Sequence, residues 1–471
     1  MTTALIVVPL LGALGLWISP WATGRAAGGF ALFVALGELA LWVGTALNFD
    51  FSSSSLQFGT ETVWFEDLGV AYKVGLFDFS LWLVGLTALA TAAAVGYGFW
   101  SARERPGVYL GLLLFLEGAT IGVFTAQDLL LFYVFWEAML IPLYVLIGVW
   151  GGAGRLGATI KFVVYTMAGS LFMLVAIIAL GLARGTFDMT QLEANDNVWI
   201  FLGFTAAFAV KAPIWPFHGW LPDAYREAPA EVSALLSGVI SKAAAYGFIR
   251  IALPSFPDPV ADWRVPVLVL ASIGLVYGSL LAFRAPDVRG VIAYSSLAQM
   301  NLIVIGVFAV NDSGLNGALL QMVNHGLISV ALFLLAGAIE RRAATGQLGL
   351  LGGMARGRPV LATLLVTTGV IALAVPGSTA FAGEFLVLNG IFVHGWGWAV
   401  VGAVAIVLAA MYVLRLVSAV LHEDVGRAVP EAALDLRPAE VGVILPLVVV
   451  LLALSFWPAA ITDHIFQAPL R

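Results

Sequence analysis

Runs of about 20 mostly apolar residues recur along the whole chain, and they constrain its fold more than any other feature. A helix of about that length crosses the hydrocarbon layer of a membrane. Hydrophobic residues make up 61% of the chain and charged residues only 11%, so a soluble fold could not cover its surface with polar groups. The sequence therefore predicts a polytopic membrane protein and argues against a soluble enzyme, a nucleic-acid binder or a disordered scaffold.

About fourteen segments have the length and composition of a membrane-spanning helix. None has the short alternating pattern of a barrel strand, so we predict an all-α fold in a single membrane domain, residues 1–471. The longest outside connection, 48–76, contains a serine run that predicts a loop. The expected spans are 3–20, 28–47, 78–100, 107–125, 128–150, 157–182, 198–219, 229–253, 264–284, 288–309, 314–340, 360–390, 396–420 and 440–458.

Basic residues fall mostly on one side of these expected helices. Thirteen arginines lie in the loops after the odd-numbered helices. The other side holds only Lys73, Arg184, Arg264 and Arg471. By the positive-inside rule, the arginine-rich side faces the cytoplasm, so we expect both termini outside.

Two expected helices contain prolines in mid-span. The stretch FAVKAPIWPFHGWLPDAY carries Pro213 and Pro216, and IALAVPGSTAFAGEFLVL carries Pro376 followed by Gly377. Proline removes a backbone hydrogen bond, and a membrane helix tolerates the loss only where protein or cavity water satisfies the freed groups. Both helices are therefore predicted to be broken.

Paired broken helices indicate internal repeats in ion transporters. Pro213 and Pro376 are 163 residues apart, close to the spacing of the helices before them. We therefore predict two five-helix repeats, helices 4–8 in 106–253 and helices 9–13 in 264–420. Helices 1–3 would occupy 1–105 and the last helix 421–471. Two unrelated proline kinks are the alternative.

Lysine and arginine are used differently in this chain. Of the four lysines, Lys161, Lys211 and Lys242 lie in expected spans, whereas most of the eighteen arginines lie in loops. Arginine keeps its proton in practice, but a buried lysine releases it readily. This distribution is what a protein that moves protons across a membrane requires.

Acidic and histidine side chains also fall inside expected spans, namely Glu38, Glu117, Glu137, Glu384, His218 and His325. A charge at the bilayer centre costs about 2.5–3.5 kcal/mol on insertion scales, so such groups need partners or water. Their usual role is an ion or proton pathway. The chain has no cysteine, which excludes thiolate zinc sites and cysteine-ligated iron–sulfur clusters.

Glu137 and Lys211 both lie near mid-span, and we expect them to pair. A nearby carboxylate stabilises the lysine ammonium, so moving that negative charge away helps the lysine release its proton. The alternative is a static buried ion pair. Because the pair adjoins the first proline break, the functional interpretation is favoured.

Lys242 has no acid one turn away and lies too far from both helix ends to reach the interface, so we predict a relay role. His325 lies between Lys242 and Glu384 in chain order and is a second relay candidate. Glu384 follows the second break by eight residues, and the repeat makes it the counterpart of Lys211 and the terminal proton group.

Four further residues are weaker candidates. His218 is either a shuttle or a satisfied core histidine, and Lys161 is either functional or an interface lysine. Glu117 could contact a neighbouring subunit or gate proton entry. Glu38 stands alone on its helix and is the weakest of the four.

Four motifs carry a family resemblance. FYVFWEAMLIPLYVLIGVWGG, KAPIWPFHGWLPDAYREAP, YSSLAQMN and PGSTAFAGEFLVLNG resemble the antiporter-like subunits of respiratory complex I, the NADH–quinone oxidoreductase. The resemblance implies fourteen helices in two inverted five-helix repeats, with helices 7 and 12 broken. The family's key glutamate and two lysines fall on Glu137, Lys211 and Lys242. Its sister chains L and N usually carry a lysine on helix 12, where this chain has Glu384.

The chain departs from the family at one position. Many members have histidine where this chain has Gln299, so the proton path there is expected to run through water. His325 on helix 11 still matches the family.

The resemblance also implies a function, a location and partners. It implies a non-redox, proton-translocating subunit of a bacterial cytoplasmic-membrane translocase, with no metal or cofactor of its own. NADH, FMN, iron–sulfur clusters and quinone would be handled by other subunits. Chains L and N and lipids would be its partners, and nucleic acid would not. The alternatives are a subunit of a Mrp-type cation/proton antiporter or a membrane-bound hydrogenase, a purely structural subunit and an organic-solute transporter.

Overall fold

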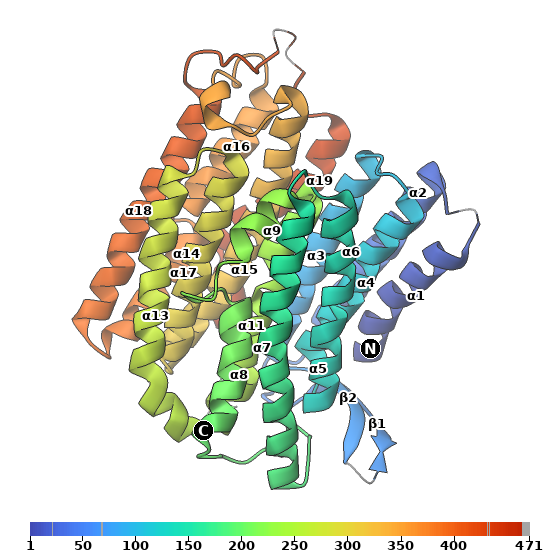
Figure 1. The fold of residues 1–471 in the computed structure, drawn as a ribbon, viewed down its shortest axis with the longest axis vertical. Helices are drawn as coiled ribbons and strands as arrows, with labels where there is room; N and C mark the ends of the chain where they lie inside the picture. Colours follow the sequence, from blue (N-terminus) through green and yellow to red (C-terminus); the bar gives the residue numbers. More distant parts are fainter. Residues whose placement is uncertain (21, 67–68, 431, 433, 464–471) are drawn as a thin grey trace.

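The chain folds into a bundle of helices that run roughly along one long axis, with a small hairpin at the lower end (Figure 1). This computed structural model describes residues 1–20, 22–66, 69–430, 432 and 434–463. The predicted helical membrane architecture is confirmed, since the described part contains 11 helices long and apolar enough to cross a membrane. The total of fourteen spans and the repeat relationship remain predictions.

Nine of the long helices are continuous apart from local changes in pitch. They are α2 (Gly24–Leu47), α3 (Asp78–Trp100), α4 (Pro106–Thr125), α7 (Arg155–Arg184), α13 (Pro257–Arg284), α14 (Val288–Phe308), α15 (Asp312–Ala343), α18 (Trp396–Leu421) and α19 (Pro438–Phe456). Shorter helices are α1 (Thr2–Ile18), α8 (Val198–Lys211), α9 (Leu221–Glu227), α16 (Pro359–Ala372), α17 (Thr379–Phe392), α20 (Ala459–Thr462) and the 3₁₀ turn η4 (Leu348–Leu350).

Both predicted helix breaks are confirmed. The first helix ends with α8 at Lys211 and resumes as α9 at Leu221, after the segment that contains Pro213 and Pro216. The second ends with α16 at Ala372 and resumes as α17 at Thr379. Prolines that cannot donate a backbone hydrogen bond lie in both gaps.

A local irregularity in a third span was not predicted. The span expected at 128–150 is divided into α5 (Leu129–Ala138) and α6 (Leu140–Trp150). Pro142 explains the interruption, because it has no N–H to donate to the carbonyl of Ala138, four residues earlier. Glu137 therefore lies just before a one-residue irregularity in a helix that spans Leu129–Trp150.

The span Ala230–Ser255 has two turns of π-helix, which the sequence did not predict. It runs as α10 (Ala230–Leu235), η2 (Leu236–Ile240), α11 (Lys242–Gly247), η3 (Phe248–Ala252) and α12 (Leu253–Ser255). In the first π turn the Ser241 N–H donates to the carbonyl of Leu236, five residues back. Such bulges occur often at functional sites, and Lys242 follows this one directly.

The connection 48–76 is a loop at its serine run, as predicted, but its second half forms a hairpin that was not predicted. Strands β1 (Gln57–Phe65) and β2 (Val70–Leu76) pair there as an antiparallel hairpin. Threonine, valine and aromatic residues of the stretch favour extended backbone. The Gln127 N–H donates to the carbonyl of Lys73, which joins the hairpin to the start of α5.

The centre of the bundle is α15. Its membrane-spanning window is wholly buried, and it packs against α14 and α17, α3 and α10, and α19. By contrast, α2, α18 and α19 keep many apolar side chains exposed. Polar side chains on α15 are therefore screened from lipid by the surrounding helices.

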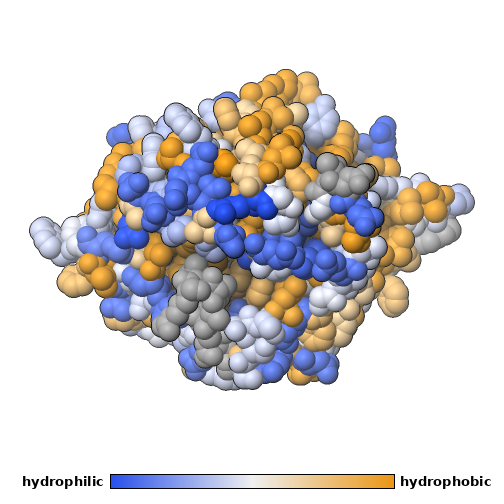
Figure 2. Space-filling view, turned by 90° about the horizontal axis from the view of Figure 1, so that it is seen from below, coloured by the Kyte–Doolittle hydropathy of each residue, from blue (hydrophilic) through white to orange (hydrophobic). Residues whose placement is uncertain are grey.

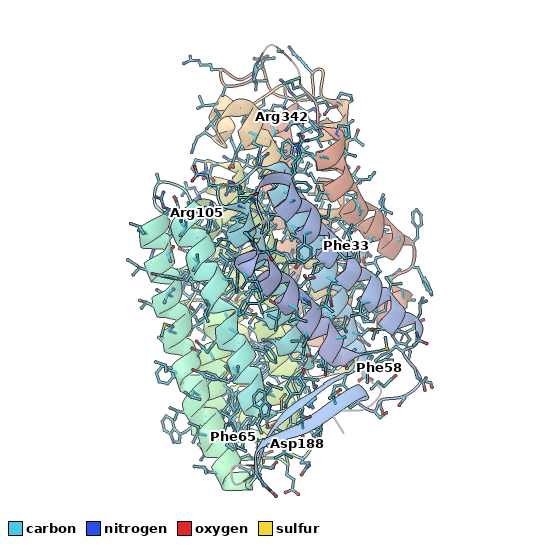
Figure 3. The ribbon with its side chains drawn as sticks, turned by 90° about the vertical axis from the view of Figure 1, so that its right-hand side faces the viewer. Phe33, Phe58, Phe65, Arg105, Asp188 and Arg342 are labelled. Carbon is cyan, nitrogen blue, oxygen red and sulfur yellow. The ribbon has the colours of Figure 1, made fainter. Side chains whose placement is uncertain are left out.

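The two ends of the bundle differ in charge. Figure 3 shows Arg105 and Arg342 toward the upper end, and Phe58, Phe65 and Asp188 at the hairpin end. The N-terminus lies at the hairpin end too, because the Thr2 hydroxyl donates to the carbonyl of Phe58. Seen from that end, hydrophilic residues gather over the middle and hydrophobic residues stand along much of the edge (Figure 2). Arg471 lies outside the described residues.

Candidate functional site

Lys242 and His325 form the closest contact between two sequence-predicted site residues. The Lys242 Nζ lies 2.7 Å from His325 Nδ1, and both side chains are buried. Lys242 also donates to the carbonyl of Ser237, which belongs to the π turn before it. His325 Nε2 lies 3.0 Å from the hydroxyl of Ser329. The sequence predicted each residue as a relay, and the fold brings the two into direct contact.

One face of α15 carries a line of polar side chains. Gln321, His325 and Ser329 are spaced four residues apart, and Asn324 is next to His325. Residues four apart lie above one another on a helix, so the line runs along its axis. All of these side chains are buried. This helix therefore links the surroundings of Lys242 to those of Glu384.

Amide side chains connect α15 to Glu384. Gln299 on α14 donates to Glu384 Oε1 at 2.9 Å, and Gln321 donates to Gln299 Oε1 at 2.9 Å. Asn324 and Thr379 continue the network through a 2.8 Å hydrogen bond from the threonine hydroxyl. The second oxygen of Glu384, Oε2, has no hydrogen-bond partner among the described residues.

The chemistry of these amides limits which residues of the polar line can carry a proton. An amide group donates and accepts hydrogen bonds but has no titratable proton near neutral pH. Gln299 and Gln321 can therefore orient the Glu384 carboxyl, but they do not pass protons to it as a histidine would. Direct hydrogen-bond contact between titratable side chains of this line is limited to Lys242 and His325 among the described residues.

Glu137 and Lys211 do not form the direct ion pair that the sequence predicted. The Lys211 Nζ lies 4.4 Å from the centroid of the Trp136 ring and has no hydrogen-bond partner in the described part of the chain. Trp136 directly precedes Glu137 on α5, so the glutamate lies near the lysine without contacting it. Their attraction therefore operates across a gap, with Trp136 offering a cation–π contact to the ammonium.

Lys211 and Glu384 lie on opposite sides of their helix breaks. Lys211 is the last residue of α8, before its break, whereas Glu384 is on α17, after its break. Each is almost fully buried. Their positions along the two broken helices thus do not match, although each residue lies close to a helix break.

Two of the weaker candidates lie away from this line. Lys161 is half-exposed and forms an ion pair with Asp223 at 2.5 Å, which favours its interpretation as an interface lysine. His218 lies in the break after α8 and makes an edge-to-face contact with Tyr277, with ring centroids 5.2 Å apart. No described residue hydrogen-bonds its Nδ1.

Glu117 and Glu38 face the same buried region between α4 and α2. These two helices pack against each other, and both glutamates are buried. None of the four carboxyl oxygens has a hydrogen-bond partner among the described residues. Val34 and Leu114 lie one turn before Glu38 and Glu117. Gly12 lets α1 pack closely against both residues, because a Cβ at Gly12 would lie 2.7 Å from Val34 and 3.2 Å from Leu114.

Sequence reasoning missed the amide network and a buried acid at the arginine-rich end. Asn324, Gln321 and Gln299 lie in expected spans, and polar residues at four-residue spacing were the available signal. Glu231 is fully buried and receives hydrogen bonds from Arg103 at 2.8 Å and Tyr109 at 2.7 Å. Only the pairing across 128 residues explains why this acid is tolerated.

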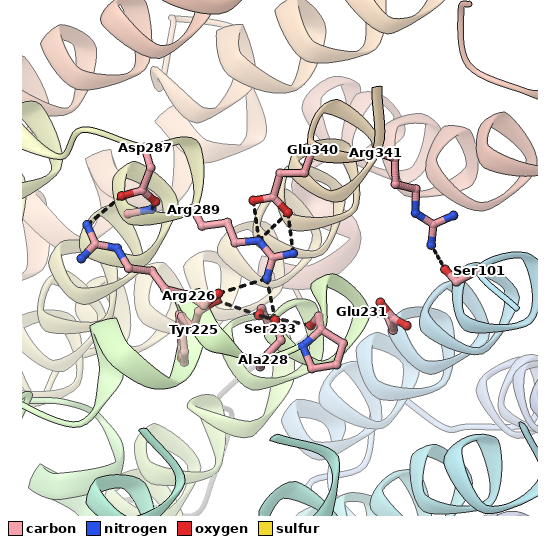
Figure 4. Close-up of polar contacts among 12 residues, drawn as sticks. Ser101, Tyr225, Arg226, Ala228, Glu231, Ser233, Asp287, Arg289, Glu340 and Arg341 are labelled. Carbon is pink, nitrogen blue, oxygen red and sulfur yellow. Dashed lines mark hydrogen bonds and ion pairs between the residues drawn. The ribbon is translucent and has the colours of Figure 1, made fainter. Parts of the chain in front are cut away.

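Ion pairs connect the helix ends near Glu231. Arg289 donates to both oxygens of Glu340, and Arg226 pairs with Asp287 at 3.1 Å (Figure 4). Arg289 also donates to the carbonyl of Ala228, at the junction of α9 and α10. These contacts hold α9, α14 and α15 in fixed relation beside the buried polar line.

The chain is similar to known membrane proteins in sequence. Residues 126–409 match a family described as NADH:quinone oxidoreductase/Mrp antiporter, TM. The chain is 37% identical to NAD(P)H-quinone oxidoreductase chain 4 1 of Synechococcus elongatus, over 98% of this chain and 89% of the relative. It is 35% identical to NADH-quinone oxidoreductase subunit M of Rhodobacter capsulatus, over 97% and 93%.

Solved structures of related membrane complexes contain chains with a similar fold. A chain of respiratory complex I from Thermus thermophilus with bound NADH matches with a TM-score of 0.90 at 30% identity, covering 98% of this chain and 97% of that one. A chain of the Mrp complex from Dietzia sp. matches with a TM-score of 0.87 at 24% identity, covering 98% and 96%. At that lower identity the likeness is one of fold.

Proposed function

This chain belongs to the membrane-subunit family shared by NADH:quinone oxidoreductase and the Mrp antiporter, and we propose that it is the proton-translocating subunit M of an NADH–quinone oxidoreductase. Relatives named subunit M or chain 4 that align with nearly the whole chain support this assignment. Glu384 also supports subunit M over its sister chains L and N, in which a lysine usually occupies that place.

The observation that carries the proposal is the buried contact of Lys242 with His325. Two titratable groups in hydrogen-bond contact can exchange a proton without moving their backbones. A purely structural subunit would have no reason to bear the desolvation cost of these groups inside the membrane. A solute carrier would need a pocket shaped for its solute, whereas this line consists of protonatable and amide groups.

The proposed path begins at Glu137 and Lys211. The Glu137 carboxylate stabilises the Lys211 ammonium at a distance, so an electrostatic change that weakens this effect favours proton release from Lys211. The proton then passes to Lys242 and His325. From there water carries it to the unpaired oxygen of Glu384, because the intervening amides do not titrate.

Redox chemistry would take place on other subunits. This chain has no cysteine, so cysteine-ligated clusters lie elsewhere in the complex. Among the described residues no group of three His, Cys, Asp or Glu side chains could hold a metal ion. We infer that antiporter-like chains L and N are its neighbours in the bacterial cytoplasmic membrane, with both termini outside.

The test is NADH-driven proton uptake in inverted membrane vesicles that carry native chain or Glu137→Gln. We expect uptake and coupled NADH oxidation to fall together, by roughly a hundredfold if the group is an essential relay. Glu193→Gln is the matched control, because Glu193 is an exposed loop acid whose loss leaves the buried line intact. Full coupled activity of Glu137→Gln would contradict the path.

Lys242 offers a sharper comparison. Lys242→Arg keeps the positive charge but does not release its proton, whereas Lys242→Gln removes both. We expect both variants to lose proton uptake. Normal amounts of assembled complex, judged by NADH oxidation with an artificial acceptor, would exclude misassembly as the cause. Pumping by Lys242→Arg at the native rate would remove Lys242 from the path.

The family match keeps one alternative open, a subunit of a Mrp-type antiporter. That assignment predicts sodium/proton exchange in vesicles without NADH, and antiporter genes beside the gene for this chain. Our proposal predicts NADH-dependent uptake and neighbouring NADH dehydrogenase genes. If deletion of the chain leaves NADH-driven uptake unchanged, the antiporter assignment takes precedence.

A further inference from the structure

A long apolar groove lies on the surface formed by α2, α3 and α19. Its volume is about 970 Å³. Small residues on α3 and α19 make room for it, among them Ala92, Gly96 and Gly442, while Leu36 and Val443 line its sides. The buried polar line does not involve these residues, which lie outside the two proposed repeats.

The groove has the depth of one membrane leaflet. Along α3 it extends from Trp100 to Leu89, eleven residues that correspond to about 16 Å of helix. The hydrocarbon core of a bilayer is about 30 Å thick, so one leaflet contributes about half of that. A neighbouring transmembrane helix would need a contact surface of the full thickness. The groove therefore fits acyl chains of a single leaflet.

Arginines stand at the upper mouth of this groove. Arg25, Arg103 and Arg105 line it there, with Glu104 as the one acid among its lining residues. Arg103 is engaged by Glu231. Arg25 and Arg105 are exposed and form no ion pair within the described part of the chain, so their charges are available to a ligand. Figure 3 shows Arg105 toward the arginine-rich end.

A second basic hollow adjoins the first at Trp100. It has a volume of about 400 Å³ and is lined by Arg341, Arg342, Arg358 and Arg437. The guanidinium groups of Arg341 and Arg437 lie 4.2 and 5.5 Å from the Trp100 ring centroid. Arg342 is paired with Glu440. Arg358 is only 2% exposed, and its Nε has no hydrogen-bond partner among the described residues.

We propose that this groove is a binding site for one anionic phospholipid of the arginine-side leaflet. The acyl chains would lie between α2, α3 and α19, and the phosphate would contact Arg25 and Arg105 at the mouth. Basic pockets between membrane helices bind anionic headgroups in this way. The excess of arginine over carboxylate at the mouth selects an anionic lipid over a zwitterionic one.

The test uses the purified membrane complex that contains this chain, with lipid retention measured by native mass spectrometry. Phosphatidylglycerol and phosphatidylcholine of equal chain length serve as probes. We expect phosphatidylglycerol to be retained preferentially. In Arg25→Gln/Arg105→Gln its affinity should fall about 30-fold, which corresponds to about 1 kcal/mol for each arginine.

A second variant tests the acyl groove independently of charge. A Cβ at Gly442 would meet no atom within 4 Å, so Gly442→Leu should fill the groove without disturbing the fold. Gly37→Leu is the control, because Gly37 is equally open but does not line the groove. We expect Gly442→Leu to abolish the retained lipid and Gly37→Leu to keep it.

Four outcomes would overturn the proposal. Equal retention of both lipids would show that the arginines do not select the headgroup. Unchanged retention in Gly442→Leu would place the lipid elsewhere. Displacement of phosphatidylglycerol by inorganic phosphate alone, with no effect of Gly442→Leu, would mean that the mouth binds free anions. A groove that takes up neither lipid in the assembled complex would be occupied by a neighbouring subunit.

Discussion

Gln299 holds the buried carboxyl of Glu384 with an amide that cannot take up a proton. The same side chain accepts a hydrogen bond from Gln321, so it has a fixed direction between the two. A histidine at this position could accept and release a proton. At the residue scale, this glutamine therefore keeps the Glu384 carboxyl in place, and on the proposed path the proton of Glu384 would arrive through water.

Replacing Gln299 separates its role in holding the Glu384 carboxyl from its inability to carry a proton. Gln299→Leu leaves Glu384 and Gln321 without their partner, and each unpaired buried group costs about 1–3 kcal/mol. We expect a lower thermal midpoint of the complex and slower proton uptake. Gln299→His keeps a donor and an acceptor, so it should retain stability and pump at least as fast. Gln347→Leu, at an exposed position, is the control. Equal stability of the leucine variant would show that the amide contact contributes nothing.

At the element scale, the breaks are as important as the helices. The chain turns between α16 and α17 at Gly377, whose φ is +97°. A side chain at such a φ is strained even where space is open, and a Cβ there would meet nothing within 4 Å. The break consequently depends on glycine for its backbone conformation and not for its packing.

Gly377→Ala should therefore destabilise the protein by about 1–2 kcal/mol through backbone strain alone. Gly44→Ala is the matched control, because Gly44 is also open but lies within helix α2. Alanine is the better helix former there, so the control should be neutral or stabilising by about 0.5–1 kcal/mol. Thermal unfolding in detergent measures both. A neutral Gly377→Ala would mean that the break tolerates an ordinary φ.

The hairpin is anchored by Lys73, which lies 2.6 Å from Asp188 and 3.2 Å from Glu61. Burial raises the pKa of Asp188, but hydrogen bonds from Lys73 and Thr190 outweigh it, so the pKa lies below its ordinary value of 3.8. Burial lowers the pKa of Lys73, but Asp188 and Glu61 raise it above its ordinary 10.5.

These shifts define a pH window for the anchor. The contribution of Asp188 is present above pH 3.8 and is lost as the pH falls through its lower folded pKa. The contribution of Lys73 is present below pH 10.5 and is lost above its raised pKa. The protection of the hairpin amides, measured as hydrogen exchange relative to the intrinsic rate at each pH, should thus be highest between these limits and fall in acid. Asp188→Asn should exchange faster at neutral pH, with a weaker acid dependence. If the native protein and Asp188→Asn showed the same exchange profile in acid, Asp188 would not contribute to the anchor.

At the scale of the whole molecule, the two ends of the bundle differ in charge. The arginine-rich end is predicted to face the cytoplasm and the hairpin end to face outward. Because the chain has no cysteine, single cysteines can be introduced without a background. Ser54 near the hairpin and Arg427 near the arginine-rich end are both exposed.

We expect a membrane-impermeant maleimide to label Ser54→Cys in intact cells and Arg427→Cys only in inverted vesicles. Each variant controls for the other, since both side chains are accessible once the correct face is exposed. The ratio of labelling between the two preparations measures the orientation. The reverse pattern would invert the predicted topology, and with it the leaflet of the proposed lipid.

Much of the fold could be predicted because its signals are local. The length of the apolar runs located the helices, and Pro213 and Pro376 located two breaks. The hairpin and the helix irregularity before Pro142 were missed. In these cases a strand pattern lay inside a polar connection, and a proline lay inside an otherwise strong helical span.

The sequence alone determined that ionisable groups such as Lys242, His325 and Glu384 lie within membrane spans, because burial follows from the hydrophobicity around each of them. Only the tertiary structure decided which of them meet. Lys242 and His325 are 83 residues apart, and Gln299 and Glu384 are 85. Helices buried on all sides carry no amphipathic pattern to indicate which face meets which neighbour. Contacts of that range are therefore set by helix packing.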